Sequence, residues 1–325
     1  MSTAQKTQKT KKKGGLRRSK RGDLIFYIVM LAFPVAQFAV FYIGVNGGSF
    51  LLAFQNIDIE SNTVVWTFRN IADAFKQMTT NADILSMAGM SLLSYALILF
   101  IGTPLGVLFS YYIHKRLPGN GAFRLILFLP SIISAIVMVT IYQFFVERAV
   151  PAYVSAIFGN KIEGLLENQN TRFATIIFYN IWVGFGTSVL MYANGMDGIS
   201  PEISEAAHLD GATGFKEFWH ITLPGIFPTL STFIIAGVAT IFTNQLNLYS
   251  FYGDAAPGSI QTFGYYLYNR TQAATSRAEY PALSAMGLIL TLIAVPLTLL
   301  VKWALEKFGP RSDCRRWYYV EKVHV

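Results

Sequence analysis

The sequence predicts an all-α membrane protein with six main transmembrane helices, and both composition and segment length support this fold class. Of the 325 residues, 53% are hydrophobic and only 14% are charged, whereas an ordinary soluble domain has about 25% charged residues. Six segments of 20 to 27 residues contain no Asp, Glu, Lys, Arg or His, and a helix needs about 20 apolar residues to cross a bilayer. These segments are residues 24–45, 87–113, 125–145, 173–193, 226–248 and 282–301.

Helices rather than strands are predicted for all six segments. Backbone N–H and C=O groups have no partners in lipid, so only helices and closed barrels span a membrane. Barrel strands are about 10 residues long and alternate in polarity, and none of the six segments does so. One such segment could be a buried helix of a soluble protein. Six uncharged segments in one chain are not expected in a soluble fold.

The first segment, residues 24–45, follows a strongly basic stretch, which is also the arrangement of a secretory signal peptide. The apolar part of a signal peptide has about 7–15 residues and precedes an A-x-A cleavage site. This segment is longer, and no such site follows it. We therefore expect a retained first helix, preceded by a basic tail of residues 1–23. The tail is predicted to touch anionic lipid and not nucleic acid, since no base-reading module follows it.

Lys and Arg are distributed unequally between the two predicted sides of the membrane. The tail 1–23, the connection 114–124, the loop 194–225 and the tail 302–325 together hold 19, whereas the other side holds seven. Cytoplasmic segments are enriched in Lys and Arg. Both termini and the loop 194–225 are therefore predicted to lie in the cytoplasm of a multi-pass plasma-membrane protein.

No catalytic or metal-binding motif is visible in the sequence. Cys314 is the only cysteine, so neither a disulfide framework nor a thiol metal site is expected. The four histidines are scattered, and no Gly-rich phosphate loop, HExxH or GxSxG sequence occurs. The chain itself is therefore predicted not to be an enzyme and to hold no metal.

The loop between the fourth and fifth segments has clear signals for two short helices joined by a turn. Ser200 before Pro201 is typical of a helix start, and the pair Asp210-Gly211 interrupts the helix that follows. Thr213 is expected to cap a second helix. Pro224 is expected to end that helix.

Two interpretations of this loop compete. It could be a helix lying among lipid headgroups, or a projection held in a groove of a cytoplasmic partner. Helices that lie on a membrane surface are rich in Lys and Arg, whereas residues 196–225 contain five acids and only Lys216. The charge balance favours a protein partner. The small and apolar side chains available for that contact are Ala206, Ala207, Ala212, Phe215, Phe218, Trp219 and Ile221.

The same loop resembles the "EAA" loop of permease subunits from binding-protein-dependent ABC importers. The sequence has Glu-Ala-Ala, three residues, Gly211, nine residues and then Ile-x-Leu-Pro. In that family this loop is a coupling helix that docks on the ATP-hydrolysing subunit, so the resemblance implies the same role here. The coupling residues it implies are Glu205, Ala206, Ala207, Asp210, Gly211, Ala212, Phe215, Phe218, Ile221, Leu223 and Pro224.

The resemblance covers residues 85–309 and is strongest for the carbohydrate-uptake branch that handles oligosaccharides and glycerol phosphate. The stretches that carry it are "FRLILFLPSIIS", "IIFYNIWVGFGTSVLMYANGMDGISPEISEAAHLDGA" and "QTFGYYLYN…YPALSAMGLIL". It implies the type I ABC importer permease fold. Two departures concern the substrate: "GDAAPG" stands where the branch often has Gly-Gly-Pro, and His208 stands where it often has Arg or Tyr.

A substrate pathway without charged residues has to be lined by neutral polar and aromatic groups, and intramembrane polar residues normally face the bundle interior. The fifth helix is expected to end with "ATIFTNQLNLYSFYG", which places Thr240, Asn244, Asn247 and Phe251 on one face. Amides and rings suit sugar hydroxyls and sugar faces, although amides also join neighbouring helices. Weaker candidates for the lining are Tyr142, Gln143 and Trp182.

The leading hypothesis is a permease subunit that imports a carbohydrate or oligosaccharide. The resemblance implies a second permease subunit, two ATPase subunits that bind the ATP and magnesium, and an extracellular solute-binding protein. Alternatives are a non-sugar solute, an ion-coupled secondary transporter, which would usually have ionisable residues in its helices, and a membrane scaffold. The expected organisation is a basic tail (1–23), a first helix (24–45), an extracellular segment (46–86), a core (87–305) with coupling loop 196–225, and a C-terminal tail (306–325).

Overall fold

The computed structural model describes residues 20–58, 63–159 and 162–310. Most of the basic tail and the residues from 311 onward, including Cys314, lie outside this description. The chain divides into two compact units, Met1–Leu52 and Ala53–Val325. In the first unit, α1 (Lys20–Gln37), the π-helical stretch η1 (Phe38–Gly44) and α2 (Val45–Leu52) follow one another without a break. The first predicted helix is present and continues to Leu52.

The segment after Leu52, predicted only as an extracellular connection, contains a hairpin and a helix. Strands β1 (Gln55–Asp58) and β2 (Thr63–Trp66) pair antiparallel, and α3 (Arg69–Thr80) follows. The side chain of Asn70 donates to the carbonyl of Gln55 at 2.7 Å and to that of Ala53 at 3.3 Å. These bonds fix the start of α3 against the hairpin.

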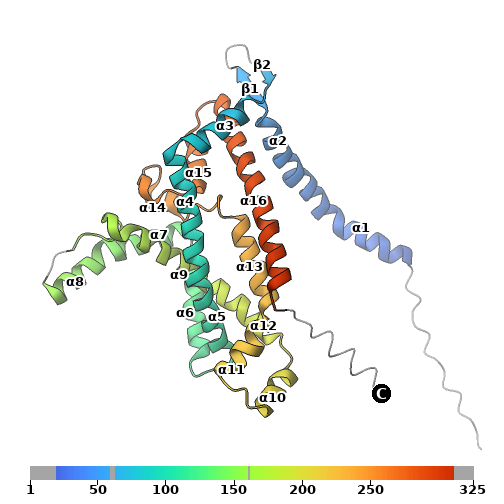
Figure 1. Ribbon diagram of the computed structural model, residues 1–325, viewed down its shortest axis with the longest axis vertical. Helices are drawn as coiled ribbons and strands as arrows, with labels where there is room; N and C mark the ends of the chain where they lie inside the picture. Colours follow the sequence, from blue (N-terminus) through green and yellow to red (C-terminus); the bar gives the residue numbers. More distant parts are fainter. Residues whose placement is uncertain (1–19, 59–62, 160–161, 311–325) are drawn as a thin grey trace, which may run out of the picture. The chain divides into compact units, whose positions relative to one another are not determined.

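Three long helices form the centre of the second unit (Figure 1). One runs from Ala82 to His114 as α4 (Ala82–Leu97), the π-helical turn η2 (Ile98–Gly102) and α5 (Thr103–His114). The others are α9 (Gln169–Asp197) and α16 (Tyr280–Phe308), and α5 packs along α9. All three are long and apolar enough to cross a membrane, as the sequence predicted.

The third predicted helix, residues 125–145, is interrupted in the structure. It is divided between α6 (Asn120–Ile132) and α7 (Ala135–Phe144) because Ile133 and Ser134 are extended, with ψ of 143° and 135°. Pro130 lies in the last turn of α6 and has no N–H to donate there. The membrane-length helix begins after this break and continues through η3 (Phe145–Ala149) into α8 (Val150–Phe158).

The fifth predicted helix, residues 226–248, also differs from the prediction. α13 (Phe227–Ala239) stops after 13 residues, and turns lead to α14 (Leu248–Tyr252). Leu246 and Asn247 have φ of 51° and 58°, and the left-handed region is incompatible with a continuing helix. The backbone of these turns lies against Gly264, where a Cβ would come within 2.6 Å of Thr243.

The remaining elements are short and complete the two ends of the bundle. Between α9 and α13 come α10 (Pro201–Leu209), α11 (Phe215–Glu217), η4 (Phe218–Thr222) and α12 (Leu223–Gly225). The helices on either side of Ile226 meet at 61° and form a sixth span if they are taken as one. Between α14 and α16 come η5 (Gly258–Ile260), α15 (Phe263–Ala273) and η6 (Arg277–Glu279).

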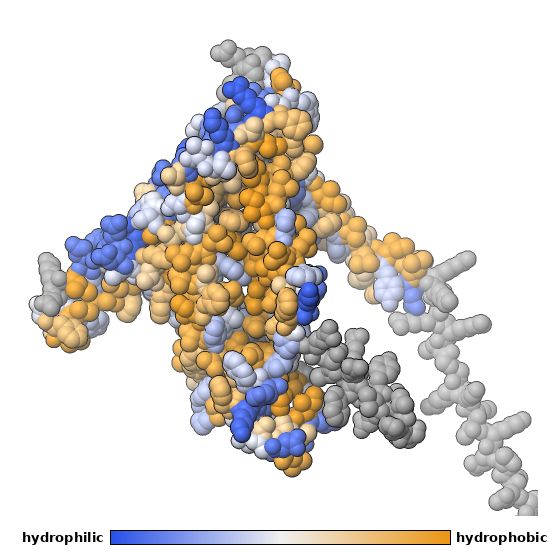
Figure 2. Space-filling view, in the orientation of Figure 1, coloured by the Kyte–Doolittle hydropathy of each residue, from blue (hydrophilic) through white to orange (hydrophobic). Residues whose placement is uncertain are grey.

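Polarity is distributed along the second unit as expected for a protein with lipid around its middle. Apolar side chains cover the visible face of α4, α13 and α16, and hydrophilic ones gather around α3 and around α10 and α11 (Figure 2). Exposed large hydrophobic residues include Leu92 of α4 and Leu292 and Leu299 of α16. An apolar surface of this extent is not stable in water, so the middle of the bundle is its membrane-embedded part.

Gly186 provides a test of the packing between α6 and α9. A Cβ at Gly186 would overlap the carbonyl of Leu127 in α6, whereas a Cβ at Gly184 would meet no atom within 4 Å. We expect Gly186→Ala to separate the two helices and to lower the melting temperature of the detergent-purified protein by several degrees. Gly184→Ala should leave it unchanged. Equal melting temperatures for the two variants would contradict this packing.

Candidate functional site

The loop between α9 and α13 folds as two helical segments joined by a tight turn, as predicted. Gly211 has φ of +79° and Gly214 has φ of +56°, and glycine adopts this region without steric cost. The amide of Ala212 donates to the carbonyl of Ala207 at 2.8 Å, which closes the end of α10. The interruption predicted at Asp210-Gly211 is confirmed, because α10 ends at Leu209.

The helix starts in this loop differ in detail from the prediction. Ser200 occupies the N-cap position and Pro201 follows it, but the Ser200 side chain makes no capping bond. The N-cap position of the second helical segment is occupied by Gly214 and not by Thr213. Because glycine has no side chain to cap with, the backbone turn itself sets where α11 begins.

The residues predicted to couple divide into an outward and an inward group. In the outward group, Phe215 and Trp219 are 72% and 54% exposed, and their rings stack with centroids 6.0 Å apart. Leu209, which was not predicted, is 90% exposed. Phe218, by contrast, is 5% exposed and packs in a core cluster. Of the predicted coupling residues, Glu205, Ala206, Asp210, Gly211 and Phe215 are exposed, Ala207 and Phe218 are buried, and Ala212, Ile221, Leu223 and Pro224 are half-buried.

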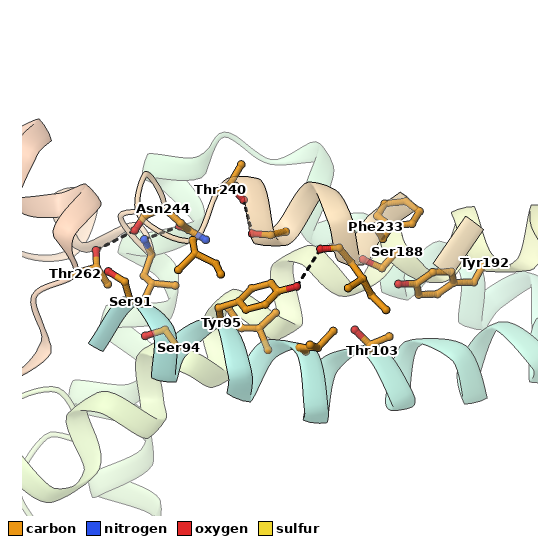
Figure 3. Close-up of a pocket in the computed structure, with 16 residues that line it drawn as sticks. Ser91, Ser94, Tyr95, Thr103, Ser188, Tyr192, Phe233, Thr240, Asn244 and Thr262 are labelled. Carbon is orange, nitrogen blue, oxygen red and sulfur yellow. Dashed lines mark hydrogen bonds between the residues drawn. The ribbon is translucent and has the colours of Figure 1, made fainter. Parts of the chain in front are cut away.

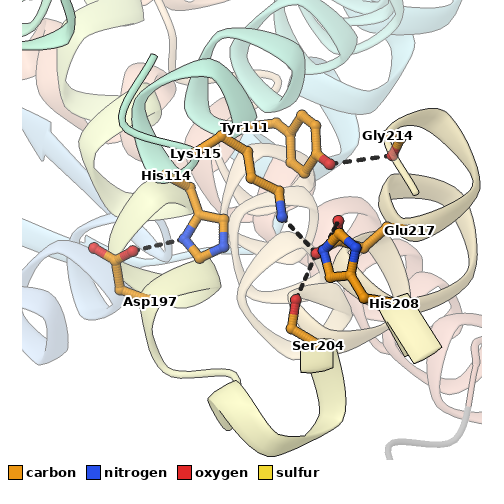
Figure 4. A network of polar contacts seen from close by, with 8 residues as sticks. All are labelled: Tyr111, His114, Lys115, Asp197, Ser204, His208, Gly214 and Glu217. Atoms are coloured by element: carbon orange, nitrogen blue, oxygen red, sulfur yellow. Dashed lines mark hydrogen bonds and ion pairs between the residues drawn. The ribbon is translucent and has the colours of Figure 1, made fainter. Parts of the chain in front are cut away.

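A buried carboxylate joins the two halves of the loop (Figure 4). The side chain of Glu217 is 3% exposed, and its Oε1 accepts hydrogen bonds from Lys115 Nζ at 2.5 Å and from Ser204 Oγ at 2.6 Å. His208 Nε2 lies 3.3 Å from Oε2. Lys115 follows directly after α5, whereas Ser204 and His208 belong to α10.

The environment of Glu217 keeps this carboxylate charged. Burial alone would raise its pKa, but hydrogen bonds from Lys115 and Ser204 and the nearby charges of Lys115 and His208 act the other way. The net effect holds the pKa of Glu217 below its usual range. The loop therefore has an ionised side chain in its interior at neutral pH.

Two further contacts join α5 to α9 and to the loop. His114 Nδ1 lies 2.6 Å from Asp197 Oδ1 at the end of α9, and the Tyr111 hydroxyl donates to the carbonyl of Gly214 at 3.1 Å. Sequence reasoning did not find Glu217 as a functional residue. The available signal was an acid among the aromatic residues of "FKEFWHI".

A cavity of about 190 Å³ lies in the bundle between α4, α5, α9 and α13 (Figure 3). Thr240 and Asn244, both predicted to line a pathway, are among its walls. Asn244 Oδ1 accepts from the amide of Leu246 at 2.9 Å. The other polar or aromatic walls, which sequence reasoning missed, are Ser91, Ser94, Tyr95, Thr103, Ser188, Tyr192, Phe233 and Thr262.

The shared helical face predicted for Thr240, Asn244, Asn247 and Phe251 does not exist, because α13 ends at Ala239. Asn247 Nδ2 instead donates to Asn180 Oδ1 at 2.9 Å.

The other predicted pathway residues also lie outside the walls of this cavity. Gln143 Nε2 donates to the carbonyl of Phe251 at 2.8 Å, and the Tyr142 hydroxyl donates to the carbonyl of Thr175 at 2.9 Å. Tyr142 and Phe251 are buried in one hydrophobic cluster, and Trp182 packs against it. These side chains serve the packing of α7, α9 and α14.

Comparison with known proteins places this geometry in a family. Residues 102–313 match the family model "Binding-protein-dependent transport system inner membrane component". The multiple sugar-binding transport system permease protein MsmF of Streptococcus mutans is 25% identical over 272 residues, 83% of this chain and 88% of MsmF. The arabinooligosaccharides transport system permease protein AraP of Bacillus subtilis is 26% identical over 211 residues, 63% of this chain and 66% of AraP.

A solved structure has the same fold. It is a chain of a bacterial alginate ABC transporter in complex with an alginate pentasaccharide-bound periplasmic protein. The TM-score is 0.74 at 21% sequence identity, over 89% of this chain and 96% of that chain. The family model spans well over half of the chain, so the protein belongs to the inner membrane components of binding-protein-dependent transport systems.

Proposed function

We propose that the chain is a permease subunit of an ABC importer that moves a carbohydrate or oligosaccharide across the bacterial plasma membrane. The observation that carries this proposal is similarity over most of its length to a permease named for multiple sugars. AraP is named for arabinooligosaccharides, and the solved relative for alginate. Hydroxyl-bearing and aromatic walls in the cavity fit a neutral, hydroxyl-rich solute.

We propose the partners that the family implies, and one surface of the chain supports the assignment. Leu209, Phe215 and Trp219 expose apolar side chains on the loop, and an amphipathic helix with such a face suits a groove on a partner. We assign this face to an ATPase subunit, which would hold the ATP and magnesium, so that the permease itself performs no catalysis. A second permease subunit would complete the pathway, and an extracellular binding protein would deliver the solute.

Coupling between the loop and the cavity requires two states of the bundle. A partner shifts such an equilibrium only by the difference in its affinity for the two states. ATP-driven closure of the ATPase pair would therefore favour the bundle conformation in which the two coupling loops lie closest. In this scheme the chain converts a displacement of the loop into a change in which side of the membrane the cavity faces.

The proposed orientation has both termini and the loop around Gly211 in the cytoplasm. Cysteines introduced at Gln77 and at Lys216, both exposed, test it in a Cys314→Ser background. A membrane-impermeant maleimide should label Gln77→Cys in intact cells and Lys216→Cys only after permeabilisation, because α3 and the loop lie at opposite ends of α4–α5. Labelling of Lys216→Cys in intact cells would reverse the topology.

Gly211 tests the role of the loop. A Cβ there would meet no atom within 4 Å, but φ is +79°, which disfavours L-residues by about 1–2 kcal/mol. We expect Gly211→Val to leave membrane insertion intact and to lower uptake at least fivefold without abolishing ATP hydrolysis. Gly211→Asn, which tolerates this conformation, should retain most uptake. Normal uptake by Gly211→Val would count against a coupling role.

Asn244 tests the role of the cavity. A hydrogen bond contributes about 0.5–1.5 kcal/mol net, so Asn244→Leu should lower uptake roughly three- to tenfold while the complex still co-purifies. Gln245→Leu is the control, since Gln245 does not line the cavity and its Oε1 is buried without a partner. Loss of uptake in Gln245→Leu with normal uptake in Asn244→Leu would move the pathway away from this cavity.

A further inference from the structure

Glu217 is bonded to parts of the chain that are otherwise separate. Within the loop it belongs to α11, and its Oε1 accepts from Ser204 of α10 at 2.6 Å. From outside the loop it accepts from Lys115 at 2.5 Å, 102 residues away in sequence. One carboxylate thus fixes α10 to α11 and both of them to the end of α5.

The contact to α5 has a second component of a different kind. Phe218 packs edge-on against Tyr111, with ring centroids 5.0 Å apart. Apolar contact of this sort is non-directional and permits the loop to rotate on α5. Charge-assisted hydrogen bonds are directional and stronger than neutral ones, so the bonds to Glu217 set the orientation that Phe218 alone leaves open.

The helix that ends beside Lys115 continues to the cavity. Thr103, at the start of α5, lines the cavity, roughly 18 Å from Lys115 at the rise of an α-helix. Between the two, the buried Ser110 hydroxyl donates to the carbonyl of Val189 in α9 at 2.9 Å. His114, at the end of α5, also contacts Asp197, at the end of α9. The helices α5 and α9 are therefore held together, and both carry cavity walls.

We propose that Glu217 is a positioning residue that joins the coupling loop to α5, so that displacement of the loop reaches the cavity as movement of the α5–α9 pair. This inference rests on the proposed function, because it requires the loop to be displaced by a partner. The connection, called the joint below, is the ion pair between the buried carboxylate of Glu217 in the loop and Lys115 at the end of α5. The exposed face of the loop binds the partner, and Glu217 passes the motion inward.

The test uses the complete complex in liposomes, with partner permease, ATPase subunits and binding protein. Glu217→Gln and Lys115→Met each remove one side of the joint. Both variants should assemble and hydrolyse ATP, with uptake per ATP about tenfold below the unsubstituted complex. The double variant should be no worse than the more impaired single variant, since both act on one interaction. Lys115→Arg, which keeps the charge, should retain most of the coupling.

A matched control is the exposed ion pair of α16. Lys302 Nζ lies 3.8 Å from Glu306 Oε1, and both side chains are more than half exposed. Exposed pairs contribute little, so Glu306→Gln should leave uptake per ATP unchanged. The proposal is overturned if Glu217→Gln and Lys115→Met keep normal uptake per ATP. It is equally overturned if both lose the assembled complex, because Glu217 would then serve folding alone.

A readout that needs no solute separates this inference from the proposed function. In a Cys314→Ser background, the maleimide labelling rate of Thr103→Cys should change at least fivefold on ATP addition, and Glu217→Gln should abolish that change. The same ATP response in Glu217→Gln would contradict the joint. If the unsubstituted complex imports no carbohydrate but shows this response, and Glu217→Gln abolishes it, the substrate class is wrong and the role of Glu217 is supported.

Discussion

Every backbone amide and carbonyl in the apolar part of the bundle has to be hydrogen-bonded inside the protein, and the rest of the structure depends on this constraint. Regular helix satisfies it, whereas the break after α13 needs other partners. There Asn180 donates to the carbonyl of Leu246 at 3.0 Å, and Thr262 donates to that of Asn244 at 2.9 Å. The amide of Leu246 donates to the Asn244 side chain. These three polar side chains thus provide the hydrogen bonds that a continuous helix would have supplied.

The same break contributes walls to the cavity. Thr240 and Asn244, in the turns that follow α13, line it together with Ser91 and Ser94 of α4. Supporting the backbone and contacting a solute compete for the same amide group. The side-chain oxygen of Asn244 accepts from the amide of Leu246, so the hydrogen bonds that this side chain can still offer come from Nδ2, which is a donor. A donor suits a solute with hydrogen-bond acceptors, as sugar hydroxyls are.

Local signals predicted the features that depend on neighbouring residues and missed those that depend on distant ones. Four of the uncharged segments lie in unbroken membrane-length helices, and Asp210-Gly211 forms a turn with positive φ at Gly211. The helix breaks after Ile132 and after Ala239 were not predicted. Pro130 was an unused local signal for the first break, whereas side chains of other elements support the turns after Ala239. Glu217 was missed for the same reason, since its partner Lys115 comes from another helix.

The interior charge of the loop is a poor source of stability and a good constraint on geometry. Removing a carboxylate and an ammonium from water costs several kcal/mol each, and their attraction offsets this only when the geometry is favourable. Packing of Phe218 with Val107, Tyr192 and Met196 would hold the loop on the bundle without any charge. An ion pair in that position fixes the orientation of the loop more than it strengthens its attachment. Glu217 accepts both hydrogen bonds only while α10, α11 and α5 keep their mutual angles. If a partner displaces the exposed face of the loop, α5 moves with the loop only when the buried face, with Glu217 and Phe218, keeps its position on α5.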